Sequence, residues 1–452
     1  MDLSDLIASR AVSSHDAYAR AINPQFVKVL RTIGFDRPWV RASGAHLYDA
    51  DGNRYLDLLG GFGMFNVGRN NPRVRQALAQ ALELEPPNAV QLGVSPLPGV
   101  LAEALIARAP AGIGKVLFTS SGTEAVEAAV KLGRAASGRT RVLSADHGFH
   151  GLTLGSLSLN GNAEFRERFE PLLPGFDRVP WNDLDALERE LVREDVGLVV
   201  LEPIQGKGCN LPAPGYLEGV QALCRRYGTL LCLDEVQTGL GRTGRFLALE
   251  HWGLEPDLIT ISKSLSGGIV PSGALLMRDA VYETVFDSLE NALSHGSTFA
   301  PNDFAMVAGL ATLEELDARR LVDHAARLGE ELLTRTRPLV DEHEVVHDVR
   351  GLGLMWAIEF AEPDRGSRAF RLIEKMQKGL FAQVVIGPLF RDHRILSQVA
   401  GHNMNVIKIL PPLVLDRDDL DWFLGALDQV LDRSRGIPRE LVGMALRAAR
   451  AR

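Results

Sequence analysis

Short apolar runs alternate with amphipathic stretches through the middle of the chain. The runs that predict strands are residues 115–120, 141–145, 197–202, 229–234, 257–262 and 273–277. Apolar residues recur at helical spacing between these runs, at 123–136, 184–193 and 217–227. Because strands that are apolar throughout are covered on both faces, the alternation predicts a mostly parallel sheet with helices on either side.

The flanking segments predict further helices and a second, smaller α+β unit. Asp51-Gly52 is a strong turn signal between two short runs, so residues 45–57 predict a hairpin. Helical spacing recurs at 72–108, with a break at 85–87, and at 302–318, 322–340, 367–378 and 417–433. We therefore expect a large domain at 71–330 and a small α+β domain at 331–436. An arm with part of the small domain would occupy 1–70, and a tail would occupy 437–452.

Composition and charge narrow the classes of function. A chain of 452 residues can bury a large core without disulfides or structural metal, and we expect no metal site. The net charge of −8 argues against binding to a nucleic-acid backbone. Cys209, Cys224 and Cys232 form no CxxC pair, and no apolar stretch approaches the ~20 residues of a membrane helix. A cytoplasmic protein with reduced cysteines and no membrane insertion is expected.

Lys263 is the first candidate for chemistry. It follows the apolar run 257–262 and precedes a Gly-rich turn, so its ammonium group is expected at the end of a buried strand. Loss of water lowers the pKa of such an amine and makes it nucleophilic towards a carbonyl carbon, as a Schiff-base lysine requires. The alternative is a lysine at a strand end that reaches solvent.

Two further segments place polar groups at strand ends. Asp234 ends the run 229–234 at the edge of a parallel sheet, where ligands bind, and an acid there can keep a pyridine nitrogen protonated. Ser121, Gly122 and Thr123 begin a helix directly after a strand, where free N–H groups and hydroxyls make an anion site. Each segment also has a plainer interpretation, as a turn or a helix cap.

Together the motifs closely resemble the class III, or ω-amino-acid type, aminotransferases, which depend on pyridoxal 5'-phosphate (PLP). The resemblance extends from about residue 44 to residue 431 and includes the spacing 263 − 234 = 29. Its motifs are Ser-Gly-Thr-Glu-Ala at 121–125, Phe-His-Gly at 149–151, Glu-Pro-Ile-Gln-Gly at 202–206, Asp-Glu-Val-Gln-Thr-Gly at 234–239, Ser-Lys at 262–263 and His-Gly-Ser-Thr-Phe at 295–299. The resemblance implies PLP fold type I (aspartate aminotransferase-like), with the cofactor bound by a large domain. That domain would contain a mixed, mostly parallel seven-stranded sheet and would be joined to a smaller α+β domain.

The resemblance also implies roles for single residues. Lys263 would hold PLP as a Schiff base and move the proton between the substrate carbon and the cofactor. Asp234 would pair with the pyridinium nitrogen, Gln237 would bond the phenolic oxygen, and Phe149 would stack on the ring. The remaining cofactor-site residues would be the phosphate ligands Ser121, Gly122 and Thr123, Thr298 from the neighbouring subunit, Glu202 near the cofactor face, and His150, which we expect to pack there. Thr298 thus implies a homodimer with shared active sites.

Departures from the family pattern concern the substrate. Lys207 stands where many relatives have a glutamate, and Lys408 stands where the usual arginine grips the carboxylate of glutamate. A lysine attracts a carboxylate as a point charge but cannot form the two parallel hydrogen bonds of arginine. Phe62 lies near the position of an aromatic hydroxyl in ornithine-type relatives. These residues predict an apolar pocket with cationic edges, suited to an acceptor with a hydrophobic body.

Arg391 and Arg394 lie in the segment 387–398, which is longer and more basic than the usual link at this point of the family pattern. We hypothesise that one of them binds an anion near the active-site mouth. The alternative is that both form surface ion pairs with Asp392 or its neighbours.

The resulting prediction is a ping-pong transaminase that uses an amine donor and an oxo acceptor. An aminomutase of the glutamate-1-semialdehyde kind, or a decarboxylating transaminase, shares the lysine, the aspartate and the phosphate site. A non-catalytic binding protein on the same fold is disfavoured by the joint presence of Lys263, Asp234, Gln237 and Thr298. No Gly-x-Gly-x-x-Gly motif follows the first strand of the sheet, which disfavours a nicotinamide-binding domain.

Overall fold

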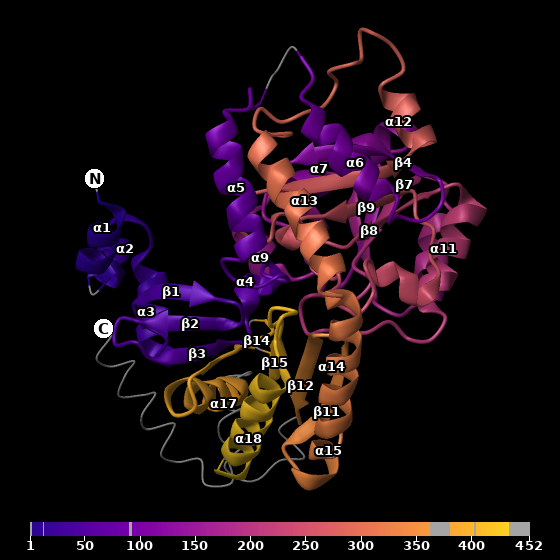
Figure 1. Cartoon of the computed structure of the whole chain (residues 1–452). Coiled ribbons are helices and arrows are strands. Elements are labelled where there is room, and N and C mark those ends of the chain that lie inside the picture. The colour runs from indigo at the N-terminus through magenta and orange to yellow at the C-terminus, as the bar shows by residue number, and fades with distance from the viewer. Residues whose placement is uncertain (1, 12, 90–92, 362–379, 402–403, 434–452) are drawn as a thin grey trace. The chain divides into compact units, whose positions relative to one another are not determined.

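The computed structural model describes all residues except 1, 12, 90–92, 362–379, 402–403 and 434–452 (Figure 1). The helix expected at 367–378 and the tail expected at 437–452 lie outside the described residues. The chain forms two compact units. The large unit comprises Gly61–Val67 and Asn71–Arg327, and the small unit comprises Met1–Gly60, Gly68–Asn70 and Leu328–Arg452.

A seven-stranded sheet forms the centre of the large unit. In spatial order its strands are β4 (Ile113–Thr119), β10 (Gly273–Arg278), β9 (Leu258–Ile261), β8 (Leu230–Asp234), β7 (Val196–Leu201), β5 (Arg141–Ala145) and β6 (Phe176–Val179). Only β10 is antiparallel to its neighbours, so the predicted mixed, mostly parallel sheet is confirmed. The apolar runs predict six of these strands. The seventh, β6, contains Asp177 and Arg178 and has no continuous apolar run.

Helices cover this sheet and connect its strands (Figure 1). Before β5 they are α4 (Gly60–Gly63), α5 (Pro72–Leu84), α6 (Pro96–Ile106) and α7 (Gly122–Ser137). Between β5 and β9 they are α8 (Leu154–Leu159), α9 (Ala163–Arg166), η1 (Glu167–Phe169), α10 (Leu184–Leu191), α11 (Tyr216–Tyr227) and η2 (Ala248–Trp252). After β9 they are η3 (Lys263–Ser266), α12 (Asp279–Val285) and α13 (Asp303–Ala318). Helix α14 (Leu321–Thr336) begins in the large unit and continues in the small unit.

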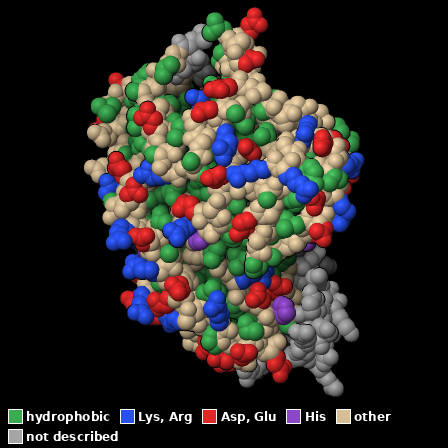
Figure 2. Space-filling model, turned by 90° about the vertical axis from the view of Figure 1, so that its right-hand side faces the viewer, with side chains coloured by type: hydrophobic (Ala, Val, Ile, Leu, Met, Phe, Trp, Pro, Cys, Tyr) green, Lys and Arg blue, Asp and Glu red, His purple; other side chains and the backbone are tan. Residues whose placement is uncertain are grey.

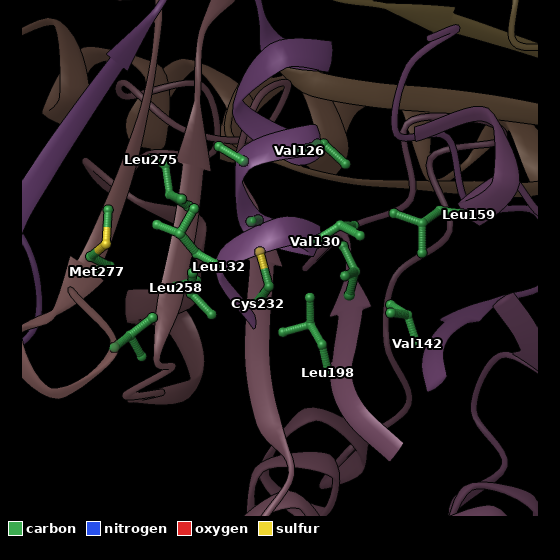
Figure 3. Packing of buried hydrophobic residues seen from close by; sticks show 14 residues of the cluster. Val126, Val130, Leu132, Val142, Leu159, Leu198, Cys232, Leu258, Leu275 and Met277 are labelled. Carbon is green, nitrogen blue, oxygen red and sulfur yellow. The ribbon is translucent and has the colours of Figure 1, made fainter. Parts of the chain in front are cut away.

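Helix α7 packs one apolar face onto the sheet (Figure 3). Val126, Val130 and Leu132 of this helix join a buried cluster with Leu198 of β7 and Cys232 of β8. Full burial of an aliphatic side chain of this size contributes about 1.5–3 kcal/mol, so the cluster fixes α7 firmly against the strands. The N-terminus of α7 is thereby held close to the carboxyl ends of the central strands.

The small unit contains two four-stranded sheets. One has the order β1 (Trp39–Ser43), β2 (His46–Asp49), β3 (Arg54–Asp57) and β13 (Ile395–Leu396), and includes the hairpin predicted at Asp51-Gly52. The other has the order β11 (Val346–Leu352), β12 (Met355–Phe360), β15 (Val406–Ile409) and β14 (Gln398–Val399). Its helices are α1 (Leu3–Ala11), α2 (Ser14–Ala21), α3 (Pro24–Ile33), α15 (Leu339–Glu342), α17 (Leu380–Arg391) and α18 (Arg417–Arg433).

The segment 387–398 is not an extended link. Its first residues complete α17, which ends at Arg391, and its last residues form β13 and the start of β14. The helix continues through Pro388, and apolar side chains of this region such as Leu389 and Phe390 are buried. Burial of these side chains outweighs the turn signal of Gly387-Pro388.

Basic and acidic side chains are interspersed over the face of the molecule seen in Figure 2. On this face, the described residues show no large cluster of lysine and arginine side chains. Across the described residues, no helix combines the length and the apolar character needed to cross a bilayer.

Candidate active site

Lys263 and Asp234 lie at the carboxyl ends of two neighbouring parallel strands, β9 and β8. Both strands are labelled in Figure 1. Strand β8 ends at Asp234, which is paired with Thr260 of β9, and Lys263 follows β9 as the first residue of η3. Lys263 is half-buried and its backbone is left-handed, with φ of +41°. Burial lowers the pKa of its amine, although the negative charges of Asp234 and Glu202 oppose the shift. The amine is therefore biased towards its nucleophilic, uncharged form.

Three donors hold the carboxylate of Asp234. The Thr260 hydroxyl donates to Oδ1 at 2.9 Å, and the Val236 N–H donates to the same oxygen at 3.1 Å. The His150 ring bonds Oδ2 through Nδ1 at 2.8 Å. Burial alone would lower the pKa of His150, but the hydrogen bond and the charge of Asp234, together with Glu202, raise it. The side chain that we expected to pack beside the cofactor is thus a hydrogen-bond partner of Asp234.

Glu202 joins two loops on this side of the sheet. It follows β7, and its carboxylate accepts from the Phe149 N–H at 2.9 Å and from the Gly206 N–H at 2.7 Å. Burial raises the pKa of Glu202, although the charge of His150 and the two N–H donors oppose that shift. The ring of Phe149 meets Phe165 edge to face, with centroids 5.3 Å apart. Lys207 extends over both rings.

The candidate phosphate site is the first turn of α7. Ser121 is the N-cap residue, and its hydroxyl accepts from the Glu124 N–H at 3.3 Å. The Thr123 hydroxyl bonds the hydroxyls of Thr153 and Ser156, at 2.8 and 2.6 Å. The Thr123 hydroxyl is therefore engaged with two other hydroxyls, whereas the Ser121 hydroxyl only accepts and keeps its own O–H to donate. The turn thus offers an anion the Ser121 O–H together with backbone N–H groups.

Gly122 brings this turn against the ends of β8 and β9. A Cβ atom at Gly122 would lie 2.9 Å from Val236 Cγ1 and 3.2 Å from Ser262 Cβ. Because Val236 and Ser262 adjoin Asp234 and Lys263, the helix N-terminus lies beside the amine and the carboxylate. A larger residue than glycine would force the helix away from them.

Gln237 and Phe62 are also brought together. The Gln237 Nε2 donates to the Phe62 carbonyl oxygen at 3.1 Å. The Phe62 side chain is 57% exposed, and its backbone is left-handed, with φ of +60°. A left-handed backbone is unusual for a large aromatic residue, and such conformations concentrate at functional sites.

Thr298 lies on an exposed segment between β10 and α13. Three residues before it, His295 Nδ1 is 2.9 Å from Lys131 Nζ on α7. Lys131 is nine residues beyond Gly122, which corresponds to about 13 Å along the helix. The contact thus attaches this segment to the middle of α7, not to the first turn that holds Ser121, Gly122 and Thr123.

The remaining substrate candidates belong to the small unit. Lys408 lies within β15, where it is paired with Ala357 and Gln398, and its side chain is almost completely buried. Arg391 is the last residue of α17. The backbone of Arg394 is left-handed, and its carbonyl oxygen accepts from the Leu56 N–H at 2.9 Å.

Sequence reasoning missed two groups that support the site. Thr260 donates a hydrogen bond to Asp234. It is the single polar residue of the apolar strand β9, and this could have indicated a buried hydrogen-bonding role. The Asn66 N–H donates to the hydroxyl of Ser264, the neighbour of Lys263, at 3.0 Å. Its amide also bonds the buried Arg242 at 2.5 Å. Asn66 follows the apolar pair Met64-Phe65, and this single polar position could have indicated a buried hydrogen-bonding role.

The fold and this constellation define a PLP fold type I transaminase, and the sequence comparison identifies the family. The model of the class-III aminotransferases matches residues 34–431, so the chain belongs to that family. It is 38% identical over 451 residues to aminotransferase PigE of a Serratia species, with 92% of this chain and 53% of that protein covered. It is 39% identical over 432 residues to putrescine aminotransferase of Pectobacterium atrosepticum, with 92% and 87% covered. The chain thus spans about half the length of the first relative and most of the second.

Comparison with solved structures shows the same fold. An amine transaminase from an uncultivated Pseudomonas species, in its PLP-bound form, superposes with a TM-score of 0.77 at 30% identity. The match covers 87% of this chain and 94% of that chain. Class III aminotransferases use PLP, so the predicted family, fold type and cofactor are confirmed.

The residues of the site fit this cofactor. PLP presents an aldehyde, a basic ring nitrogen and a phosphate, and when bound it supplies an electron sink for charge that develops on the substrate carbon. Lys263 offers an amine of lowered pKa, and Asp234 offers a buried carboxylate fixed by three donors. The first turn of α7 offers N–H groups, and Gly122 leaves the space that a Cβ would fill.

Proposed function

We propose that this chain transfers an amino group from an amine or amino-acid donor to an oxo acceptor, in two half-reactions at one site. The observation that carries the proposal is the position of Lys263 beside Asp234 at adjacent strand ends, with an amine whose pKa is lowered by burial. In its uncharged form this amine can attack the cofactor aldehyde. It can later accept the proton from the substrate carbon that bears nitrogen and return it elsewhere.

The other site residues would hold and orient the reacting groups. Asp234 would hold the ring nitrogen in its protonated form, with His150 and Thr260 fixing the carboxylate. Phe149, anchored through Glu202, would cover one face of the ring. Gln237 would bond the phenolic oxygen, and the N–H groups at Ser121, Gly122 and Thr123 would bind the phosphate.

We further propose that the active form is a homodimer in which Thr298 of one subunit completes the phosphate site of the other. Large apolar side chains flank Thr298 in the exposed segment, and Leu289, Leu293 and Phe299 are 97%, 84% and 72% exposed. Apolar side chains gathered in this way favour contact with another protein surface. Cys209, Cys224 and Cys232 are buried thiols, which supports a cytoplasmic location.

Visible absorption spectroscopy of the purified holoenzyme tests the proposed reaction. We expect an absorption band of the bound cofactor that disappears when a suitable donor is added and returns when an oxo acceptor follows. The donors are glutamate, alanine, ornithine, 4-aminobutyrate, putrescine and a long-chain amine. Lys263→Ala is the control, since it should remove both the band and the response to donors.

An aminomutase gives a different result. Such an enzyme would complete its reaction with a single amino aldehyde and would need no separate acceptor. A spectrum that responds to the amino aldehyde alone, with no response to any donor of the panel, would therefore contradict the transaminase proposal.

A further inference from the structure

Lys207 lies over the aromatic pair Phe149 and Phe165. Its Nζ is 4.6 Å from the centroid of the Phe165 ring and 5.7 Å from that of Phe149. The face of an aromatic ring carries partial negative charge, which attracts an ammonium group at this range. The two rings therefore stabilise the Lys207 ammonium group at this position.

The backbone that carries Lys207 is held on the same scaffold as the candidate cofactor site. Gly206, the preceding residue, donates its N–H to Glu202, and the same carboxylate accepts the N–H of Phe149. The bonded Gln205–Asn210 bridge closes the loop around Lys207. One buried carboxylate thus fixes both loops, so the backbone that carries Lys207 is held beside the loop that carries Phe149.

The ammonium group of Lys207 is attracted by the two aromatic rings. Among the described residues it forms no ion pair with a carboxylate. Glu164 and Glu202 act on it only through their charge, and both oxygens of Glu202 already accept backbone N–H groups. Ring faces leave the N–H donors of an ammonium group available for stronger acceptors. Lys207 is half-buried, and a cation in such surroundings gains most from an anion that arrives with the ligand.

We propose that Lys207 is a specificity-determining residue that binds a carboxylate on the substrate, remote from the reacting nitrogen. The substrate class is then an amine or oxo compound with a free carboxylate group. The inference rests on the transaminase function proposed above, because the ring of Phe149 is expected to lie on the cofactor face. A carboxylate bound by Lys207 would then lie beside that ring.

The same charge acts against a diamine. Two like charges a few ångströms apart repel each other, and the repulsion is stronger where less water lies between them. The far ammonium group of putrescine would approach Lys207, whereas the carboxylate of 4-aminobutyrate would be attracted. The preferred substrates of this chain would thus differ from the diamine in the name of its relative from Pectobacterium.

The experiment compares three linear amines that differ in their far end: 4-aminobutyrate, butylamine and putrescine. Values of kcat and KM would be measured for the holoenzyme and for Lys207→Met, Lys207→Arg and Lys207→Glu. We expect Lys207→Met to raise KM for 4-aminobutyrate about tenfold, with kcat and the values for butylamine nearly unchanged. Lys207→Arg should keep the low KM for 4-aminobutyrate, and Lys207→Glu should lower KM for putrescine.

A binding measurement separates this inference from the transaminase proposal. Butyrate has the carboxylate but no amino group, so its dissociation constant for the holoenzyme can be measured by calorimetry without turnover. We expect Lys207→Met to weaken butyrate binding about tenfold even if none of the three amines is a substrate. Equal changes in KM for all three amines, or butyrate binding that is the same in wild type and Lys207→Met, would overturn the inference and leave Lys207 a packing residue.

Discussion

His150 and Asp234 form a buried pair, in which the histidine Nδ1 lies 2.8 Å from the carboxylate Oδ2. The side chains of His150 and Asp234 are 1% and 4% exposed. Their hydrogen bond joins the loop between β5 and α8 to the end of β8. A buried carboxylate without a partner takes up a proton readily, because burial disfavours its charge. The histidine therefore fixes the carboxylate of Asp234 by a hydrogen bond at the place where a ring nitrogen would be bound.

Replacing His150 by phenylalanine should weaken binding of the cofactor. His150→Phe keeps the bulk of the ring but removes a hydrogen bond to a charged group, which is worth about 1.5–3 kcal/mol. We expect the dissociation constant of PLP to rise about 10- to 100-fold, as measured by titration of the apoprotein. The exposed His347 provides the control, since His347→Phe should bind PLP as the wild type does.

A second variant tests whether the hydrogen bond of His150, and not only the bulk of its ring, supports cofactor binding. His150→Asn retains an N–H donor on a shorter side chain and should bind PLP more tightly than His150→Phe. If the two variants were equally impaired, or if neither differed from wild type, the hydrogen bond would have no part in cofactor binding.

Lys263 should reduce the stability of the apoprotein while it serves catalysis. Burial lowers its pKa, so charging the amine at neutral pH opposes folding. A base with a depressed pKa in the folded state has no cost above its unfolded pKa, and the cost grows as pH falls from the unfolded pKa to the folded pKa, below which it is constant. We expect Lys263→Met to raise the apoprotein Tm at pH 7 by about 2 °C, with a smaller gain at pH 10.

Lys263→Met should lower the transaminase activity although it raises the Tm. Lys263→Met removes both the nucleophile and the proton carrier, and we expect the rate of transamination to fall by about 10⁴-fold. Lys28→Met, at an exposed lysine of α3, should change neither the Tm nor the rate. If Lys263→Met instead lowered the Tm of the apoprotein, the buried amine would not destabilise the folded wild-type chain.

The sequence predicts the sheet of the large unit because each of its central strands is apolar throughout. It also predicts that Asp234 and Lys263 lie at the ends of two such strands, and the structure shows that these two strands are parallel neighbours. The partners of these two residues could not be predicted from the pattern. Thr260 and Asn66 are single polar residues in apolar surroundings, and only the tertiary structure shows which group each one bonds.

The first turn of α7 shows a second limit of sequence reasoning. Ser121, Gly122 and Thr123 are alike as small residues at a helix start, and each is a reasonable phosphate ligand. The structure separates them, because the Thr123 hydroxyl bonds Thr153 and Ser156, whereas the Ser121 hydroxyl only accepts from the Glu124 N–H and keeps its own O–H to donate. Such competition between a ligand and local hydrogen bonds depends on residues about thirty positions away, which the local motif does not include.

Glu235 should make stability depend on pH. Its side chain is almost fully buried and accepts from the Thr238 hydroxyl and, at 2.7 Å, from the Leu249 N–H. Burial raises its pKa to about 7, although these donors oppose the shift. Since the folded pKa lies above the unfolded value, the contribution of Glu235 is full below the unfolded pKa and is lost as pH rises towards about 7.

The variant Glu235→Gln removes this titration and keeps an acceptor for the Leu249 N–H. We expect the free energy of unfolding of the variant, relative to wild type, to increase by about 3 kcal/mol between pH 4.5 and pH 8. Urea titrations of the apoprotein at several pH values would measure it. The exposed Glu218 supplies the comparison, and a pH profile for Glu235→Gln that parallels that of Glu218→Gln would contradict the buried titration.

Gly122 should tolerate no side chain, although it lies in a helix where alanine is normally preferred. A methyl group there would meet Val236 at 2.9 Å and Ser262 at 3.2 Å, and both neighbours belong to the strand ends that carry Asp234 and Lys263. Overpacking of this kind costs about 1–3 kcal/mol and moves the helix start. We expect Gly122→Ala to lower the Tm by several degrees and to raise the dissociation constant of PLP about tenfold.

Two other helical glycines provide matched controls. A Cβ atom at Gly99 of α6 or at Gly425 of α18 would meet no other atom within 4 Å, and both positions are exposed. Alanine is favoured over glycine in an open helix by up to about 1 kcal/mol, so Gly99→Ala and Gly425→Ala should raise the Tm slightly. If Gly122→Ala behaved like these two, the close approach of α7 to the strand ends would not constrain the candidate cofactor site. A loss confined to Gly122→Ala, in both Tm and PLP binding, would show that this contact fixes the phosphate-binding turn beside Lys263.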